Sequence, residues 1–170
     1  MIDVRIREAN AGDVSGIQRV ARRGWYAAYE DFLSPETIEA KLGEWYATEP
    51  LRENVEREDV GYFVAVDEEQ VLGYAAGGPS DDGPAIGFLG AIYVDPDFWG
   101  EGIGSQLLAR VESFLAERGY ERLRFNVFAE NDVGKAFYRS RGYEVVEKAE
   151  TDVGNDVAEE LVFEGPIRQP

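Results

Sequence analysis

The stretch Ile86-Gly-Phe-Leu-Gly-Ala-Ile-Tyr-Val94, followed by Asp95-Pro-Asp-Phe-Trp-Gly-Glu-Gly-Ile-Gly-Ser105, determines the predicted fold. Its first nine residues are almost wholly apolar and stop at Asp-Pro, which predicts a buried central strand. Apolar residues then recur at helical spacing from Ile103 to Leu115, and Gly119 ends that helix as a C-terminal cap residue. We therefore expect a strand, a glycine-rich loop and a long amphipathic helix.

The loop carries glycines at positions 100, 102 and 104. Glycine lets the backbone approach a ligand closely, and successive N–H groups at a helix N-terminus favour an anion such as pyrophosphate. Two other phosphate-binding loops do not fit, because Gly104-Ser105-Gln106 lacks the lysine of a P-loop and Ser105 stands where a dinucleotide fingerprint has its third glycine. The pattern alone leaves a flexible turn open as the alternative.

The remaining elements follow from periodicity and turn residues. Before the quoted stretch we expect a strand at 4–7, helices at 13–28 and 34–48, and a hairpin of strands at 61–66 and 71–76. After it we expect a strand at 123–128, a helix at 132–140, and strands at 143–146 and 157–163, with Gly154-Asn155 as the turn before the last strand. The predicted order is βααβββαβαββ, an α/β (α+β) chain forming one domain over residues 1–170.

The glycine-rich loop and a second segment, residues 131–143, together resemble one known family. Val94-Asp95-Pro96 followed by Trp99-Gly100-Glu101-Gly102-Ile103-Gly104 resembles the acetyl-CoA motif of the GNAT superfamily of N-acetyltransferases, Arg/Gln-x-x-Gly-x-Gly/Ala, with Trp99 at the Arg/Gln position. Residues 131–143, Asn-Asp-Val-Gly-Lys-Ala-Phe-Tyr-Arg-Ser-Arg-Gly-Tyr, resemble the family's Asn-x-x-Ala-x-x-Phe/Leu-Tyr-x-x-x-Gly-Phe/Tyr pattern, with Gly134 in place of Ala. The similarity spans roughly residues 61–163.

The resemblance implies a GNAT-type fold, with a central mixed, mostly antiparallel sheet of about seven strands and four flanking helices. It also implies acetyl-CoA as the acetyl donor, without a metal. Tyr138 would be the general acid near the thioester sulfur, and Asn131 would bind the pantetheine arm. Separately, Lys135 and Arg139 belong to the densest basic group beside a motif, which suits the CoA phosphates; the alternative is ordinary pairing with surface acids. The full set of expected acetyl-CoA contacts is Ile92, Tyr93, Val94, Trp99, Gly100, Glu101, Gly102, Ile103, Gly104, Ser105, Asn131, Lys135 and Tyr138.

The resemblance further implies direct acetyl transfer to a primary amine of a small molecule, polyamine or peptide. Several family members place a carboxylate early on the fourth strand, but Ile86 to Val94 contains none, and Phe88 lies near the expected place. The general base is therefore unassigned, and the candidates are the acids Glu30 and Asp31, Tyr93, and a water chain. Trp25, Tyr29 and Glu30 would line the acceptor pocket; the alternative is an ordinary amphipathic helix. A module that binds acetyl-CoA without turnover, and a protein N-terminal acetyltransferase, are the competing functions.

Composition narrows the chemistry. With 17 basic and 34 acidic residues the net charge is −17, which argues against nucleic acid as a partner because that binding relies on clustered Lys and Arg. No His and no Cys occur, so disulfides and thiolate or imidazole chemistry are excluded. No apolar run approaches the ~18 residues of a membrane span, so we expect a cytoplasmic protein without a membrane partner. The acidic composition with only three lysines resembles that of proteins from halophiles. Because homodimers are common among similar enzymes, a homodimer is a further expectation.

Overall fold

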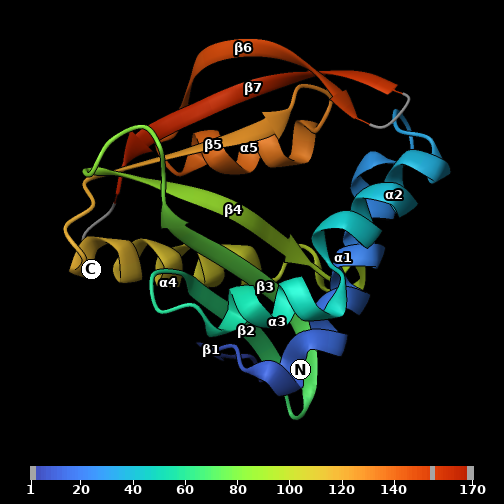
Figure 1. The fold of residues 1–170 in the computed structure, drawn as a ribbon, viewed down its shortest axis with the longest axis vertical. Coiled ribbons are helices and arrows are strands. Elements are labelled where there is room, and N and C mark those ends of the chain that lie inside the picture. Colours follow the sequence, from blue (N-terminus) through green and yellow to red (C-terminus); the bar gives the residue numbers. More distant parts are fainter. Residues whose placement is uncertain (1–2, 154–155, 168–170) are drawn as a thin grey trace.

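The computed structural model describes residues 3–153 and 156–167, and one seven-stranded sheet forms its centre (Figure 1). The strands lie in the order β1-β2-β3-β4-β5-β7-β6. Their bounds are β1 (Arg5–Glu8), β2 (Gly61–Asp67), β3 (Gln70–Pro79), β4 (Ile86–Val94), β5 (Arg122–Phe128), β6 (Glu144–Val153) and β7 (Asp156–Pro166). Only β4 and β5 pair in parallel, and all other neighbours are antiparallel. The predicted mixed, mostly antiparallel sheet is confirmed, while the predicted turn at Gly154-Asn155 lies outside the described residues.

The number of α-helices in the described residues exceeds the prediction by one. They are α1 (Val14–Tyr29), α2 (Pro35–Trp45), α3 (Thr48–Glu56), α4 (Ile103–Glu117) and α5 (Asp132–Ser140), with short 3-10 turns η1 (Ala11–Asp13) and η2 (Pro96–Phe98). The order is therefore βαααβββαβαββ, apart from the 3-10 turns, and the predicted count of four helices was wrong. No helix in the described part of the chain is long and apolar enough to span a membrane.

The additional helix, α3, begins where the backbone changes direction after α2. Tyr46 leaves helical geometry at φ −121°, and Ala47 is extended as the N-cap of α3. Pro50 falls in the first turn, where a missing N–H has no cost. Only Leu51 and Val55 are buried, one turn apart, so the short polar segment carries too little periodicity for a sequence-based prediction.

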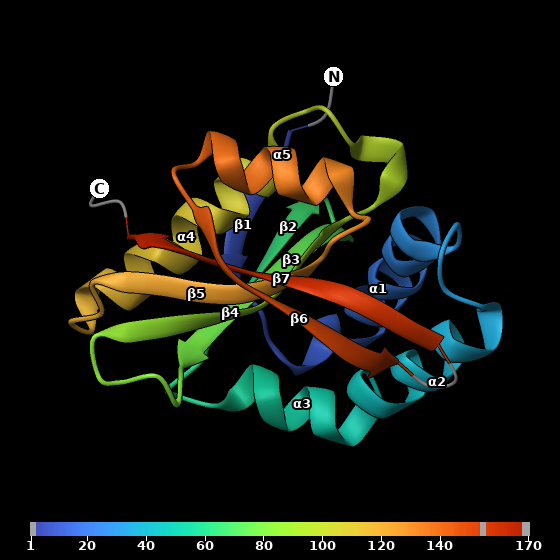
Figure 2. The ribbon, with the colours of Figure 1, turned by 90° about the horizontal axis from the view of Figure 1, so that it is seen from above.

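The helices cover the two faces of the sheet separately (Figure 2). On one face α1, α2 and α3 pack against side chains of β2 and β3, including Tyr62 and Tyr74. On the other face α4 packs on the sheet through Leu107, Val111 and Leu115, and α5 adds Tyr138 beside β5 and β7. Burial of these apolar side chains, at about 25 cal/mol per Å², fixes both layers on the sheet.

The middle of the sheet is irregular at β4. Ala76 pairs with Ala91 but Gly77 pairs with Leu89, so Gly90 is an extra residue that forms a β-bulge. β4 pairs with β5 only from Ile86↔Arg122 to Phe88↔Arg124. Figure 1 shows the two strands side by side at their N-terminal ends and separated toward their C-terminal ends. The second half of β4 thus has a neighbouring strand on one side only.

A buried hydrogen bond ties α4 to the start of β6, and it gives the first testable prediction. The Tyr143 hydroxyl donates to Glu112 Oε2 at 2.6 Å, and the two residues are 0% and 5% exposed. Tyr143→Phe leaves the buried carboxylate without this donor, so we expect the free energy of unfolding to fall by about 1–3 kcal/mol. Urea unfolding measures the change.

The matched control is Tyr120→Phe, because the Tyr120 side chain is partly buried and its hydroxyl makes no hydrogen bond within the described residues. We expect a change below about 0.5 kcal/mol for the control. Equal losses in the two variants would show that the Tyr143–Glu112 bond has no special weight.

Candidate active site

The loop before α4 has the geometry of an anion site. Gly100 and Gly102 have φ of 83° and 82°, a left-handed backbone that favours glycine, and Gly102 is the N-cap of α4 without a side-chain cap. A Cβ at either glycine would meet nothing within 4 Å, so the loop faces open space. The first helical bond runs from Gln106 N–H to Gly102 C=O, which leaves the preceding N–H groups at residues 103–105 without an acceptor in the described chain.

The side chains of this loop do not block it. The Trp99 indole is 45% exposed, and its Nε1 donates to the Val94 carbonyl at 2.8 Å, so it folds back onto the end of β4. Glu101 is exposed, and Ile103 is buried beneath the first turn of α4. Gly104 lies against α5, since a Cβ there would be 3.6 Å from Phe137. The two predicted motifs are therefore adjacent in space.

The free edge of β4 offers main-chain groups beside this loop. The Asp95 N–H donates to the Leu72 carbonyl at 2.7 Å, so Asp95 directs its backbone toward β3. Because backbone groups alternate along an antiparallel strand, Ile92 and Val94 direct theirs to the opposite side, where β5 has separated. The Val94 carbonyl accepts the Trp99 bond, so the Ile92 groups and the Val94 N–H are available to a ligand.

Two tyrosine hydroxyls, from α1 and β4, meet near this edge, and Tyr138 of α5 lies close enough to interact with both electrostatically. Tyr29 Oη and Tyr93 Oη form a hydrogen bond of 2.8 Å. Burial raises the pKa of Tyr93 well above its ordinary value, and the nearby Tyr29 and Tyr138 add to the increase. Burial likewise raises the pKa of Tyr138, and its ring lies 4.4 Å from that of Phe125.

The residues predicted to line the acceptor pocket separate into buried and exposed positions. Trp25 and Tyr29 are 3% and 6% exposed and belong to the core, where both contact the Phe128 ring. The Trp25 Nε1 is buried without an aligned acceptor in the described chain. Glu30 is exposed at the end of α1. Tyr29 reaches the β4 edge through Tyr93, whereas Glu30 makes no ion pair within the described residues.

The second motif begins α5. Asn131 is its N-cap, with Oδ1 accepting the Gly134 N–H at 2.9 Å, so this side chain has a structural role beside any contact through its Nδ2. A Cβ at Gly134 would lie 2.5 Å from that Nδ2, so an alanine here would require the Asn131 amide to shift. Lys135 pairs with Asp132 at 3.0 Å, and Arg139 lies over the Phe163 ring at 5.9 Å.

Sequence reasoning missed the ion pairs that anchor the loop. Asp95 is 2% exposed, and its carboxylate accepts from Arg19 at 2.9 Å, Arg23 at 3.2 Å and the Asp97 N–H at 3.0 Å. Arg19 also donates to the Val71 carbonyl at 2.5 Å. The four-residue spacing of the two arginines on α1 was the available signal, but it did not reveal their partner. In residues 3–153 and 156–167, no three His, Cys, Asp or Glu side chains gather to hold a metal ion.

Asp95 also makes stability depend on pH. Burial alone would raise the pKa of Asp95, but the bonds from Asp97 N–H, Arg19 and Arg23 outweigh it and lower the pKa. Stabilisation is therefore complete above the ordinary pKa of about 3.9 and is lost as pH falls through the lower folded-state value. We expect Asp95→Asn to reduce the free energy of unfolding by about 1–2 kcal/mol at pH 7, and less toward pH 3. Urea unfolding at each pH tests this.

Asp97→Asn is the control, because that carboxylate also pairs with Arg23 but its side chain is 74% exposed. An exposed pair contributes little, so the expected change is below about 0.5 kcal/mol. A pH-independent difference between wild type and Asp95→Asn would contradict the assignment.

Comparisons with known proteins agree with this geometry. The model of the Acetyltransferase (GNAT) family matches residues 25–143. The chain is 27% identical over 174 residues to the spermidine N(1)-acetyltransferase of Thermoplasma acidophilum, covering 96% of this chain and 99% of that protein.

Solved structures extend the likeness to three dimensions. The crystal structure of the PaiA N-acetyltransferase from T. acidophilum in complex with coenzyme A has a TM-score of 0.84 and 25% identity, covering 97% of this chain and 99% of that one. The ribosomal-protein-alanine N-acetyltransferase from Brucella melitensis has a TM-score of 0.73 and 25% identity, covering 95% and 99%. The family model covers well over half of the chain. The chain therefore belongs to the acetyltransferase (GNAT) family and is an N-acetyltransferase.

Proposed function

We propose that this chain, as one domain over residues 1–170, transfers the acetyl group of acetyl-CoA to a primary amine by direct attack within a ternary complex. The observation that carries the proposal is the free edge of β4 next to the open N-terminus of α4. One arm of the donor can pair with the edge as a missing strand would, while its pyrophosphate meets the helix N–H groups. The relative solved with coenzyme A supports this choice of donor.

Each predicted contact then has a defined task. Backbone N–H groups at residues 103–105 hold the pyrophosphate, and Gly100, Gly102 and Gly104 keep the approach open. Trp99 and Glu101 flank the loop. The pantetheine arm follows Ile92 to Val94, with Asn131 Nδ2 as a further donor. Lys135 is close enough to its own Asp132 that it serves the phosphates only by exchanging that partner.

Attack of the amine gives a tetrahedral oxyanion, which main-chain donors on the β4 edge stabilise. Collapse of this intermediate releases a thiolate with an ordinary pKa of about 8.5. Tyr138 is buried and its raised pKa keeps it protonated, so it always has a hydrogen to donate toward the departing sulfur. Complete proton transfer from such a phenol is uphill, and the hydrogen bond itself supplies the stabilisation.

The acceptor class is the open part of the proposal. Relatives named for spermidine and for ribosomal protein alanine place polyamines and peptide N-termini beside small amines in the test panel. Trp25 and Tyr29 lie on the sheet face that carries α1, and Glu30 ends that helix; we propose this face as the acceptor side. An acetyl-CoA-binding module without turnover would bind CoA but release no thiol with any amine.

Tyr138→Phe tests the role of the hydroxyl. The ring and its packing against Phe125 are kept, so CoA affinity and thermal stability should change little. We expect kcat to fall by about 10–100-fold, since a general acid contributes roughly 10²–10⁴ and water can replace part of the donation. Free thiol released from acetyl-CoA with the best amine of the panel measures the rate.

The comparison variant is Tyr26→Phe, because Tyr26 lies on the surface of α1 and its hydroxyl donates to Glu39. Equal rates for Tyr138→Phe and wild type would remove Tyr138 from the mechanism.

The acidic surface leads us to propose a cytoplasmic enzyme adapted to high salt, working as a monomer or a homodimer. A net charge of −17 on 170 residues opposes the compact state, and salt screens this repulsion as the Debye length falls to ~3 Å at 1 M. We expect the Tm to rise by about 5–10 °C between 0.1 and 2 M KCl. Thermal unfolding followed by circular dichroism checks this.

Sucrose at matched osmolality is the control, because it does not screen charge. A Tm that rises equally in sucrose, or not at all in KCl, would speak against salt adaptation.

A further inference from the structure

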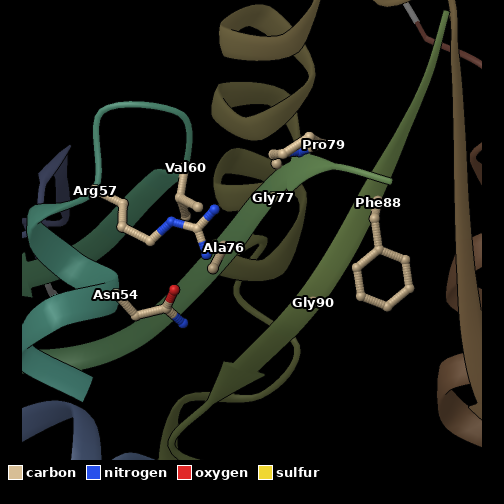
Figure 3. A pocket seen from close by; sticks show the side chains of 9 residues that line it. Asn54, Arg57, Val60, Ala76, Gly77, Pro79, Phe88 and Gly90 are labelled. Carbon is tan, nitrogen blue, oxygen red and sulfur yellow. The ribbon is translucent and has the colours of Figure 1, made fainter. Parts of the chain in front are cut away.

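A pocket lies on the sheet face that carries α1 and α3, between α3 and the bulged part of β4 (Figure 3). Its volume is about 200 Å³. Six of its lining residues matter here: Asn54, Arg57, Ala76, Gly78, Phe88 and Gly90. We call it the α3–β4 pocket.

Missing side chains keep this pocket open. A Cβ at Gly90 would come no closer than 3.8 Å to any neighbour, so the bulge leaves space that a side chain could fill. The Phe88 ring stands beside this space and is 41% exposed. An exposed aromatic ring facing uncovered backbone is a surface that an apolar group can cover favourably.

The pocket lies within reach of the reacting edge. Gly90 is two residues before Ile92, about 7 Å along the strand. Ala91 and Tyr93 direct their side chains to the same face as the pocket, where α1 and α3 pack. An amine of modest length can therefore place its nitrogen near Ile92 and its other end against Phe88.

The polar groups of the pocket select against a second positive charge. Arg57 is its only ionisable lining residue among those described, and no carboxylate lines it. The Arg57 Nε and Nη2 donate to Asp59 at 2.8 and 2.7 Å, which leaves Nη1 for another acceptor. Figure 3 shows the Asn54 amide and the Arg57 guanidinium on the same wall of the pocket. An ammonium group here would meet the Arg57 guanidinium, and the nearby Asp59 carboxylate is already paired with Arg57, whereas an oxygen would have donors.

We infer that the α3–β4 pocket receives the non-reacting end of the acceptor, and that this end is an uncharged, partly apolar group with an oxygen acceptor. This inference rests on the proposed amine acetylation. An arylalkylamine with a phenolic or amide oxygen has the required chemistry, whereas an extended polyamine would bring a second ammonium to Arg57.

Four amines separate the contributions of the ring, the oxygen and the charge to binding in the pocket. Tyramine has a ring and an oxygen, phenethylamine has a ring alone, ethylamine has neither, and spermidine has a cationic tail.

Phe88→Ala should raise KM for tyramine and phenethylamine about tenfold, which corresponds to the loss of about 1.4 kcal/mol of ring contact. We expect kcat to stay within twofold and KM for ethylamine to be unchanged. Arg57→Ala should raise KM for tyramine more than for phenethylamine. Arg52→Ala is the control, because it removes the same charge from α3 outside the pocket.

Binding without turnover gives an independent readout. Calorimetric titration of tyramine into the CoA-loaded protein should show binding that Phe88→Ala weakens about tenfold and Phe88→Leu largely restores. If no amine releases CoA, the proposed function fails while this titration still tests the pocket. The inference is overturned if spermidine is the best substrate with a KM that Phe88→Ala leaves unchanged, or if Phe88→Ala raises KM for ethylamine as much as for tyramine.

Discussion

The site depends on the separation of β4 from β5 after Phe88 and Arg124. Backbone N–H and C=O groups inside a sheet normally pair, and leaving them unpaired costs free energy. Here β5 is paired along its other side with β7 from Arg122 to Phe128, so the unpaired groups belong to β4 and the inner side of β5. A ligand or solvent must satisfy them. The same feature that weakens the sheet therefore creates its binding edge, and the bulge at Gly90 sets where this edge begins.

The ion pairs at Asp95 connect this edge to the glycine loop. In a chain of net charge −17, two arginines of α1 are both committed to one buried carboxylate, and one of them also reaches the carbonyl of Val71 on β3. This arrangement fixes α1, β3 and the start of η2 relative to one another. The loop can then use left-handed glycines at 100 and 102 without losing its position. The ion pairs at Asp95 therefore hold the glycine loop in position although its glycines allow many backbone conformations.

The sequence revealed β4 by its apolar run ending at Asp-Pro, α4 by its helical periodicity, and the hairpin of β2 and β3 by its pattern and turn residues. It did not reveal α3, because a helix with Leu51 and Val55 as its only buried side chains has almost no pattern. The two motifs located the loop and α5, and the structure brings them together at Gly104 and Phe137. The burial of Tyr138 and the α3–β4 pocket could not be predicted. Both depend on which surfaces distant segments cover and which they leave exposed, and no local spacing encodes that.

The β4 edge has groups that can donate a proton, but β4 itself carries no carboxylate that could accept one. Tyr29, Tyr93 and Tyr138 all have pKa values raised by burial, so they are neutral hydroxyls rather than bases. They can donate to a departing thiolate, but no carboxylate of β4 stands ready to take a proton from the amine. Near Ile92, where the reacting nitrogen is proposed to lie, these neutral hydroxyls offer an ammonium no counter-ion, and removal from water disfavours the charged form of an amine. In the proposed reaction, exclusion of the ammonium form would itself do part of the work of a base, leaving the last proton to solvent.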